Sequence, residues 1–221
     1  MMDQDLKKNI LTTGTSLVGI VCKDGVVMAS DRRSSAGGIV MNKNRQKAQM
    51  INDYLVVSGT GISSDIDVAK KIIPAQLKLK ELREKKRSTV QEAANLIATI
   101  LYNNIRRPSV IPFMAGLMVG GVNEDGSAEL YSVEPAGGVS KVEDYDANFS
   151  SGMPYILGLL ERQWKKDLTM EEGVELAVES IKSSSQRDSA SGNGIDVFTI
   201  TKDGIKHVSK QRVESVYKET D

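Results

Sequence analysis

The chain has 221 residues, which suits one domain or at most two small ones with a sizeable core. Its 29 Lys and Arg residues balance its 29 Asp and Glu residues, so no overall charge attracts nucleic acid or an anionic membrane. No stretch is apolar for long enough to cross a bilayer, and the N-terminal segment lacks the apolar core of a secretory signal. We therefore expect a soluble, cytoplasmic protein.

Hydrophobic periodicity predicts a group of strands, two helices, further strands, two more helices and a final hairpin. The expected strands cover residues 15–22, 26–31, 39–41, 54–58, 113–122, 128–133, 139–148, 195–201 and 205–209. The expected helices cover residues 62–86, 89–106, 153–166 and 169–186. Pro74 is expected to kink the first helix, and Thr169 with Glu172 predicts a capping box for the last.

The order of these elements predicts the fold class. Hairpin-linked strands imply antiparallel sheets, and two separated helix pairs can each cover one sheet. We expect a single α+β domain in the form of a four-layer α/β/β/α sandwich of two antiparallel sheets.

The junction between Gly14 and Thr15 separates a short polar leader from an apolar, strand-forming run. Cleavage there would free the α-amino group of Thr15, which would place a nucleophilic hydroxyl and a base on one residue. The alternative is an ordinary polar turn before a strand.

The single cysteine and the single histidine argue against disulfide, metal and histidine-based catalytic sites. Cys22 is the single cysteine, so an intramolecular disulfide and a Cys-rich metal site are excluded, and its apolar surroundings favour a small buried side chain. The single histidine, His207, lies in a polar segment near the C-terminus. A hydrolase with this sequence is expected to use a base other than histidine, with no metal and no cofactor.

Several polar residues at strand ends and in Gly-rich turns are further candidates for chemistry. Each alone is equally consistent with a surface charge, a turn or a helix cap. The segments concerned, in chain order, are Gly14–Ile20, Ala29–Arg33, Lys47, Ser58–Gly59, Ser151–Gly152 and Gln186–Gly192. Together they resemble the β-subunit of an archaeal 20S proteasome, a threonine peptidase of the N-terminal nucleophile hydrolase fold. The resemblance covers essentially the whole chain.

The resemblance implies that Thr15 is the mature N-terminal nucleophile, released by autolysis of the Gly14–Thr15 bond. Residues 1–14 would then be a propeptide, and residues 15–221 a single catalytic domain. The reaction implied is endopeptidase hydrolysis of unfolded proteins through an acyl-enzyme ester on Thr15, inside a barrel-shaped chamber.

The resemblance also assigns roles to other positions. The implied catalytic set is Thr15, Asp31, Lys47, Ser151, Asp188 and Ser191. Gly59 matches the oxyanion donor, and the positions that match the substrate side-chain pocket are Ser34, Arg45, Gln49 and Val57. Arg45 and Gln49 make this pocket more polar than the family pattern, so we hypothesise that it accepts acidic or polar side chains. The alternative is that Arg45 points into solvent.

Expected partners follow from the resemblance. They are further copies of the chain, with or without a second β-subunit, in seven-membered rings, then rings of α-subunits, and regulatory ATPase caps that act through the α-rings. Four alternatives are weighed against this interpretation: a catalytically silent β-subunit, an α-subunit, an N-terminal nucleophile amidase that acts on small molecules, and the bacterial two-ring peptidase relative.

Overall fold

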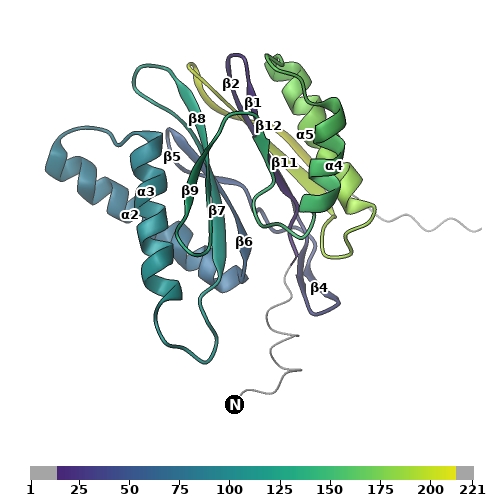
Figure 1. The fold of residues 1–221 in the computed structure, drawn as a ribbon, viewed down its shortest axis with the longest axis horizontal. Coiled ribbons are helices and arrows are strands. Elements are labelled where there is room, and N and C mark those ends of the chain that lie inside the picture. The colour runs from purple at the N-terminus through teal and green to yellow at the C-terminus, as the bar shows by residue number, and fades with distance from the viewer. Residues whose placement is uncertain (1–13, 213–221) are drawn as a thin grey trace, which may run out of the picture.

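Two five-stranded antiparallel sheets face each other between two pairs of helices in the computed structural model of the chain (Figure 1). The structure describes residues 14–212. This arrangement confirms the expected four-layer α/β/β/α sandwich. None of the helices in this range is long and apolar enough to cross a membrane.

The first sheet has the strand order β10-β1-β2-β11-β12. Its strands are β1 (Leu17–Cys22), β2 (Gly25–Asp31), β10 (Tyr145–Asp146), β11 (Gly194–Thr201) and β12 (Gly204–Arg212). The central strands β1, β2 and β11 are almost entirely buried, so their ends can carry side chains into a site that is shielded from water.

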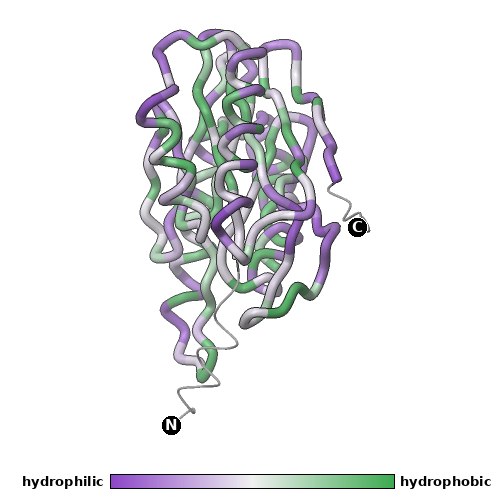
Figure 2. Tube along the Cα trace, turned by 90° about the vertical axis from the view of Figure 1, so that its right-hand side faces the viewer, coloured by the Kyte–Doolittle hydropathy of each residue, from purple (hydrophilic) through white to green (hydrophobic). Residues whose placement is uncertain are grey.

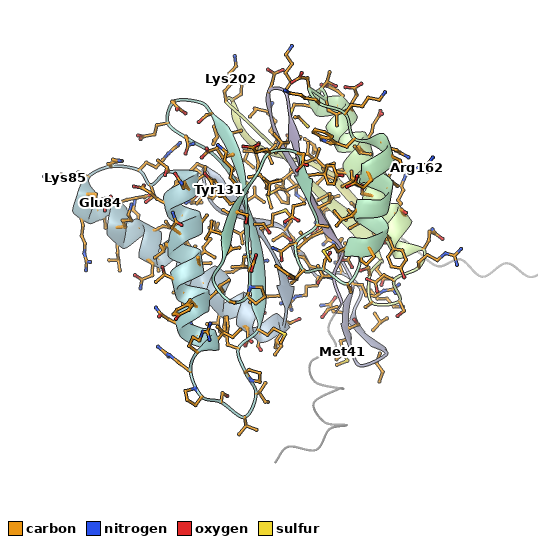
Figure 3. All side chains as sticks on the ribbon, in the orientation of Figure 1. Met41, Glu84, Lys85, Tyr131, Arg162 and Lys202 are labelled. Atoms are coloured by element: carbon orange, nitrogen blue, oxygen red, sulfur yellow. The ribbon has the colours of Figure 1, made fainter. Side chains whose placement is uncertain are left out.

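The second sheet has the order β5-β6-β7-β8-β9, and a separate two-stranded hairpin stands beside the layers. The sheet consists of β5 (Gln49–Asn52), β6 (Leu55–Gly61), β7 (Ala115–Val122), β8 (Ala128–Val133) and β9 (Val139–Val142). The hairpin consists of β3 (Ser34–Ala36) and β4 (Ile39–Asn42), and Figure 3 shows Met41 at its outer end.

Each sheet is covered on its outer face by two helices (Figure 1). Helices α2 (Ser63–Glu84) and α3 (Val90–Ile105) cover the second sheet, and α4 (Met153–Gln163) and α5 (Met170–Ser185) cover the first. Both α3 and α5 begin with a capping box, in which a threonine accepts a hydrogen bond from the backbone of a glutamate three residues later. The predicted capping box of the last helix is confirmed.

Apolar side chains fill the spaces between the layers (Figure 3). Figure 2 shows hydrophobic stretches along strands inside the molecule and hydrophilic stretches in the turns at its upper end. The two sheets approach closely at glycines: a Cβ on Gly19 would lie 2.7 Å from Leu130, and one on Gly120 would lie 2.6 Å from Met28. These glycines therefore set the spacing of the central layers.

The structure corrects several element predictions. The strand expected over residues 139–148 is two strands, because the chain turns after Val142, leaves β8 and pairs Tyr145 with Ile20 of β1 in the other sheet. Strands β3 and β5 were not expected, since both are short and polar at a sheet edge. Helix α4 ends at Gln163 rather than near residue 166. Pro74 lies inside α2, and the kink expected there stays a prediction.

Leu130 is fully buried between the sheets, so its truncation tests the packing of the central layers. We expect Leu130→Ala to lower the free energy of unfolding of the isolated chain by about 2–5 kcal/mol, because a cavity replaces well-packed methyl groups. Urea denaturation measures this difference. The control is Leu82→Ala in α2, where the leucine is 64% exposed and the change should stay within about 0.5 kcal/mol. Similar losses in the two variants would contradict this packing.

Candidate active site

Thr15 lies immediately before β1 and is almost completely buried. Its backbone N–H donates a hydrogen bond to Ser151 Oγ at 3.0 Å, and its hydroxyl donates to the carbonyl oxygen of Gly14 at 2.8 Å. The threonine is thus held at both its nitrogen and its hydroxyl while the peptide bond before it is intact.

Gly14 packs tightly against the loop that follows α5. A Cβ built on Gly14 would lie 1.8 Å from the Cβ of Ala190, which no real pair of atoms tolerates. Only glycine fits at this position in the intact chain.

Asp31 ends β2 and is completely buried, yet its carboxylate is fully engaged. Oδ1 accepts hydrogen bonds from Lys47 Nζ at 2.7 Å and from the backbone N–H of Ser16 at 2.9 Å. Oδ2 accepts from the backbone N–H groups of Arg33 and Gly192. Four donors around one buried carboxylate compensate for its loss of hydration.

The Lys47 ammonium is the group that connects this carboxylate to Thr15. Its Nζ lies 2.7 Å from Asp31 Oδ1, 2.8 Å from the Gly14 carbonyl oxygen and 3.2 Å from Thr15 Oγ1. Burial lowers the pKa of the Lys47 ammonium, and the charge of Asp31 opposes this shift. A cation held at this point stabilises negative charge that develops on either oxygen.

A second polar cluster lies on the opposite side of Thr15. Ser151 Oγ is 2.7 Å from Asp188 Oδ2 and 3.0 Å from the carbonyl oxygen of Thr15, and Ser191 Oγ donates to Asp188 Oδ2 at 2.6 Å. The structure therefore brings all six residues of the expected catalytic set together around Thr15.

Two further hydroxyls extend this cluster and were not anticipated. Ser16 Oγ donates to Ser191 Oγ at 2.7 Å, and it also shares a short hydrogen bond with Ser184 Oγ of α5. Gly152 makes room for them, because a Cβ there would lie 2.1 Å from Ser16 Oγ. The sequence signal was a serine on the apolar face of α5, three residues after Ile181.

A narrow cavity opens beside Thr15, which we call the Thr15 cavity. It encloses about 20 Å³ of open space, room for about one water molecule. Of the four expected pocket residues, Ser34 and Arg45 line it. Gln49 and Val57 do not; they face each other across β5 and β6, and Val57 is fully buried in the core beneath the helices.

Arg45 is held at the rim of the cavity by an ion pair. Its NH2 group lies 2.6 Å from Asp67 Oδ1, with the two side chains 29% and 50% exposed. Five residues of the lining were not anticipated as site residues: Ser35 of β3, Gly61 of β6, and Ser63, Ile66 and Lys70 of α2.

Gly59, the expected oxyanion donor, also lines the Thr15 cavity, together with Gly61. The hydrogen bond from the Ile62 N–H to the Met114 carbonyl fixes which residues of β6 hydrogen-bond to β7. In an antiparallel pair every second residue does so, and here these residues are Thr60 and Ser58. The alternating N–H groups of Gly59 and Gly61 accordingly point away from β7. The assignment of the oxyanion donor to Gly59 stays a prediction.

The single histidine and the single cysteine make structural contacts away from Thr15. His207 of β12 stacks on Phe198 and lies 3.1 Å from Asp196, which also pairs with Arg32. Cys22 is buried, and burial raises the pKa of its thiol to about 11, as is typical of an unreactive cysteine. Within residues 14–212, no group of three or more His, Cys, Asp or Glu side chains is arranged to hold a metal ion.

Comparison with known proteins identifies the family. A family model described as "Proteasome subunit" matches residues 11–200, which is most of the chain. The chain belongs to the proteasome subunit family.

Individual proteasome subunits of the β type are similar to the chain over nearly its whole length. A "Proteasome subunit beta" of Archaeoglobus profundus is 38% identical over 203 residues, which cover 92% of each chain. A "Proteasome subunit beta 2" of Pyrococcus abyssi is 39% identical over 93% of this chain and 96% of the relative. A "Proteasome subunit beta" of Nanoarchaeum equitans is 39% identical over 87% of this chain and 95% of the relative.

These similarities confirm the predicted family and the predicted class of enzyme, a proteasome β-subunit of the threonine endopeptidase type. They do not test the roles of individual residues, which rest on the geometry described above. The division of the chain after Gly14 into a propeptide and a catalytic domain also stays a prediction. The leader before Gly14 lies outside the described residues.

The buried ion pair between Asp31 and Lys47 gives this proteasome subunit a testable weak point. We expect Asp31→Asn to lower the free energy of unfolding of the unassembled chain by about 3–5 kcal/mol, because the remaining buried charge loses its partner. The matched control is Asp67→Asn, which breaks the part-exposed pair with Arg45 and should cost about 1 kcal/mol or less. Urea unfolding at neutral pH compares the two, and equal losses would argue against a dominant role for the buried pair.

Proposed function

We propose that the chain is a precursor in which Thr15 cleaves the Gly14–Thr15 bond, releasing residues 1–14 as a propeptide and leaving residues 15–221 as the catalytic domain. One observation carries this proposal. The Thr15 hydroxyl and the Lys47 ammonium both lie 2.8 Å from the carbonyl oxygen of the bond to be broken. A nucleophile and a cation therefore converge on one peptide group.

The cleavage proceeds as a transfer of the acyl group from nitrogen to oxygen. Thr15 Oγ1 attacks the carbonyl carbon of Gly14, and the negative charge that forms on the Gly14 oxygen is stabilised by Lys47 Nζ. The C–N bond then breaks, and the nitrogen takes up the proton that the hydroxyl has lost. Water hydrolyses the resulting ester, which leaves a carboxylate on Gly14 and a free amine on Thr15.

The same groups then hydrolyse substrates. In the mature chain Thr15 Oγ1 attacks a substrate carbonyl, and its proton passes to the new α-amino group and on to the leaving amine. Lys47, held by Asp31, favours the ionised hydroxyl, while water completes the cycle by hydrolysing the ester. The bond from the Thr15 nitrogen to Ser151 supports this role, because it fixes the position that the amine occupies.

The supporting residues follow from their contacts with that nitrogen. Ser151, Asp188 and Ser191 form a connected cluster that orients the amine through Ser151, and the buried contacts of Ser16 with Ser184 and Ser191 keep it rigid. Gly59 donates its N–H to the oxyanion of the substrate. Removing one such donor typically costs about 2.7–4 kcal/mol of activation free energy.

As a proteasome β-subunit, the chain assembles into rings together with α-subunits. We infer seven-membered rings of this chain, with or without a second β-subunit, enclosed by α-subunit rings that communicate with regulatory ATPase caps. The substrates are unfolded proteins of the cytoplasm. Confining the active sites in a chamber protects folded proteins, and the leader keeps the amine of Thr15 blocked until assembly.

Replacing Thr15 with Ala tests both reactions. After co-expression with an archaeal α-subunit, N-terminal sequencing of the wild-type chain should begin at Thr15. Thr15→Ala should retain its leader and show no peptide hydrolysis, because no hydroxyl remains to attack either carbonyl. Fluorogenic peptides measure the activity of the assembled particle.

Thr13→Ala is the matched control, because it removes a neighbouring hydroxyl in the leader. This variant should still begin at Thr15 and retain wild-type turnover. A wild-type chain that keeps its leader in the assembled particle would instead identify a catalytically silent subunit.

A further inference from the structure

Helix α2 carries a lysine on its buried face, where apolar residues are expected. Lys70 follows Ile66 by one helical turn and precedes Ile73, and it is only 8% exposed. Burying an ammonium costs free energy unless the charge is paired. Its position therefore calls for an explanation beyond packing.

The contacts of Lys70 direct its ammonium to the active site. Nζ donates a short hydrogen bond to the backbone carbonyl oxygen of Lys47, and Lys70 lines the Thr15 cavity together with Arg45 and Thr15. An ammonium carries three N–H donors, and this is the single hydrogen bond that Lys70 makes within the described part of the chain.

The charges around the cavity are unequal. Three cations line it, Arg45, Lys47 and Lys70. Lys47 is paired with Asp31 and Arg45 is paired with Asp67. Lys70 forms no ion pair with any carboxylate among residues 14–212, so the cavity retains one positive charge.

The hydroxyl of Ser35, a second polar group in the lining, also lacks a hydrogen-bond partner within the described residues. Ser35 is 9% exposed and lines the same cavity, and its hydroxyl oxygen has no hydrogen-bond partner in the described structure. Buried polar groups normally have hydrogen-bond partners, so a hydroxyl without one, in the same cavity lining as an ammonium without a carboxylate partner, indicates a site for an acceptor.

We propose that Lys70 is a specificity-determining residue, which binds the carboxylate of an acidic substrate side chain in the Thr15 cavity so that the peptidase cleaves after Asp and Glu. This rests on the proposed function of Thr15. Lys70 and Ser35 donate to the carboxylate oxygens, and the entering charge neutralises the cavity. The preference for acidic side chains would then come from Lys70 and not from Arg45, because Asp67 already neutralises Arg45.

The narrow cavity is compatible with this occupant. The side chains of Arg45 and Asp67 form the outer wall and are part-exposed, and an ion pair of this kind holds its geometry only weakly. The wall can therefore swing outward, whereas Lys70 and Ser35 are fixed by burial. The shorter Asp side chain needs less movement than Glu.

The experiment compares kcat/KM for peptides that differ only in the residue before the cleaved bond, Asp, Glu, Ala or Tyr, in the assembled particle. We expect wild type to favour Asp and Glu over Tyr. Lys70→Met should lower the ratio of acidic to Ala-peptide cleavage by about tenfold or more, the worth of one charge-assisted hydrogen bond. Lys71→Met, which removes an exposed lysine from the same helix, should leave this ratio unchanged.

The pH dependence of wild type gives a second readout that needs no variant. The pKa of Lys70 is lowered to about 8, mainly by burial; the charge of Asp67 opposes this shift, and the charges of Arg45 and Lys47 contribute to it. Because the carboxylate requires the protonated amine, the ratio of Asp- to Ala-peptide kcat/KM should fall about tenfold from pH 7 to pH 9. Taking the ratio cancels titration of the Thr15 amine, which affects both peptides.

The outcomes separate the two proposals. An equal loss of activity on all peptides in Lys70→Met would show that Lys70 only positions Lys47, and would overturn the inference. So would a flat pH ratio, or wild-type cleavage after Tyr with none after Asp or Glu. A processed, assembled particle that cleaves none of the peptides would overturn the proposed function itself.

Discussion

The buried ion pair between Asp31 and Lys47 is the interaction on which the site depends. Asp31 can be buried only because four donors surround it, and three of them are backbone N–H groups. Those groups come from the residue before β1, from the turn after β2 and from the segment before β11, so the carboxylate joins three parts of the chain beside the first sheet. Lys47 then reaches from the beginning of the second sheet across to Thr15. The ion pair thereby ties the two central layers together at Thr15.

The packed layers of the fold keep water away from the ion pair between Asp31 and Lys47. Close packing at Gly19 and Gly120 brings the sheets together, and the helices outside them exclude water from the strand ends. In this low-dielectric setting, burial shifts the Lys47 pKa downward while Asp31 resists the shift. The ammonium therefore remains beside the hydroxyl of Thr15 yet is less firmly protonated than a lysine in water. The balance follows from the fold as a whole rather than from any one contact.

Much of the fold could be predicted from local pattern, because a continuous apolar run marks β7 and helical periodicity marks α5. Periodicity does not specify which sheet a strand joins, and for this reason the division between β9 and β10 was missed. In the site, motif residues such as Thr15 and Asp31 lie at recognisable strand boundaries. Lys70 and Ser184 were missed because each is an ordinary polar residue until three-dimensional packing turns it inward.

The tight fit of Gly14 against Ala190 has a consequence for how the leader and substrates differ. An acyl residue that bears a side chain cannot follow the backbone course that Gly14 takes beside Ala190 in the intact chain. Cleaved proteins must therefore approach Thr15 along another path, with their side chains directed elsewhere. If the proposed cleavage occurs, the released peptide ends at a glycine whose fit differs from that of the residues the enzyme digests, so this peptide should have little tendency to return as a product inhibitor.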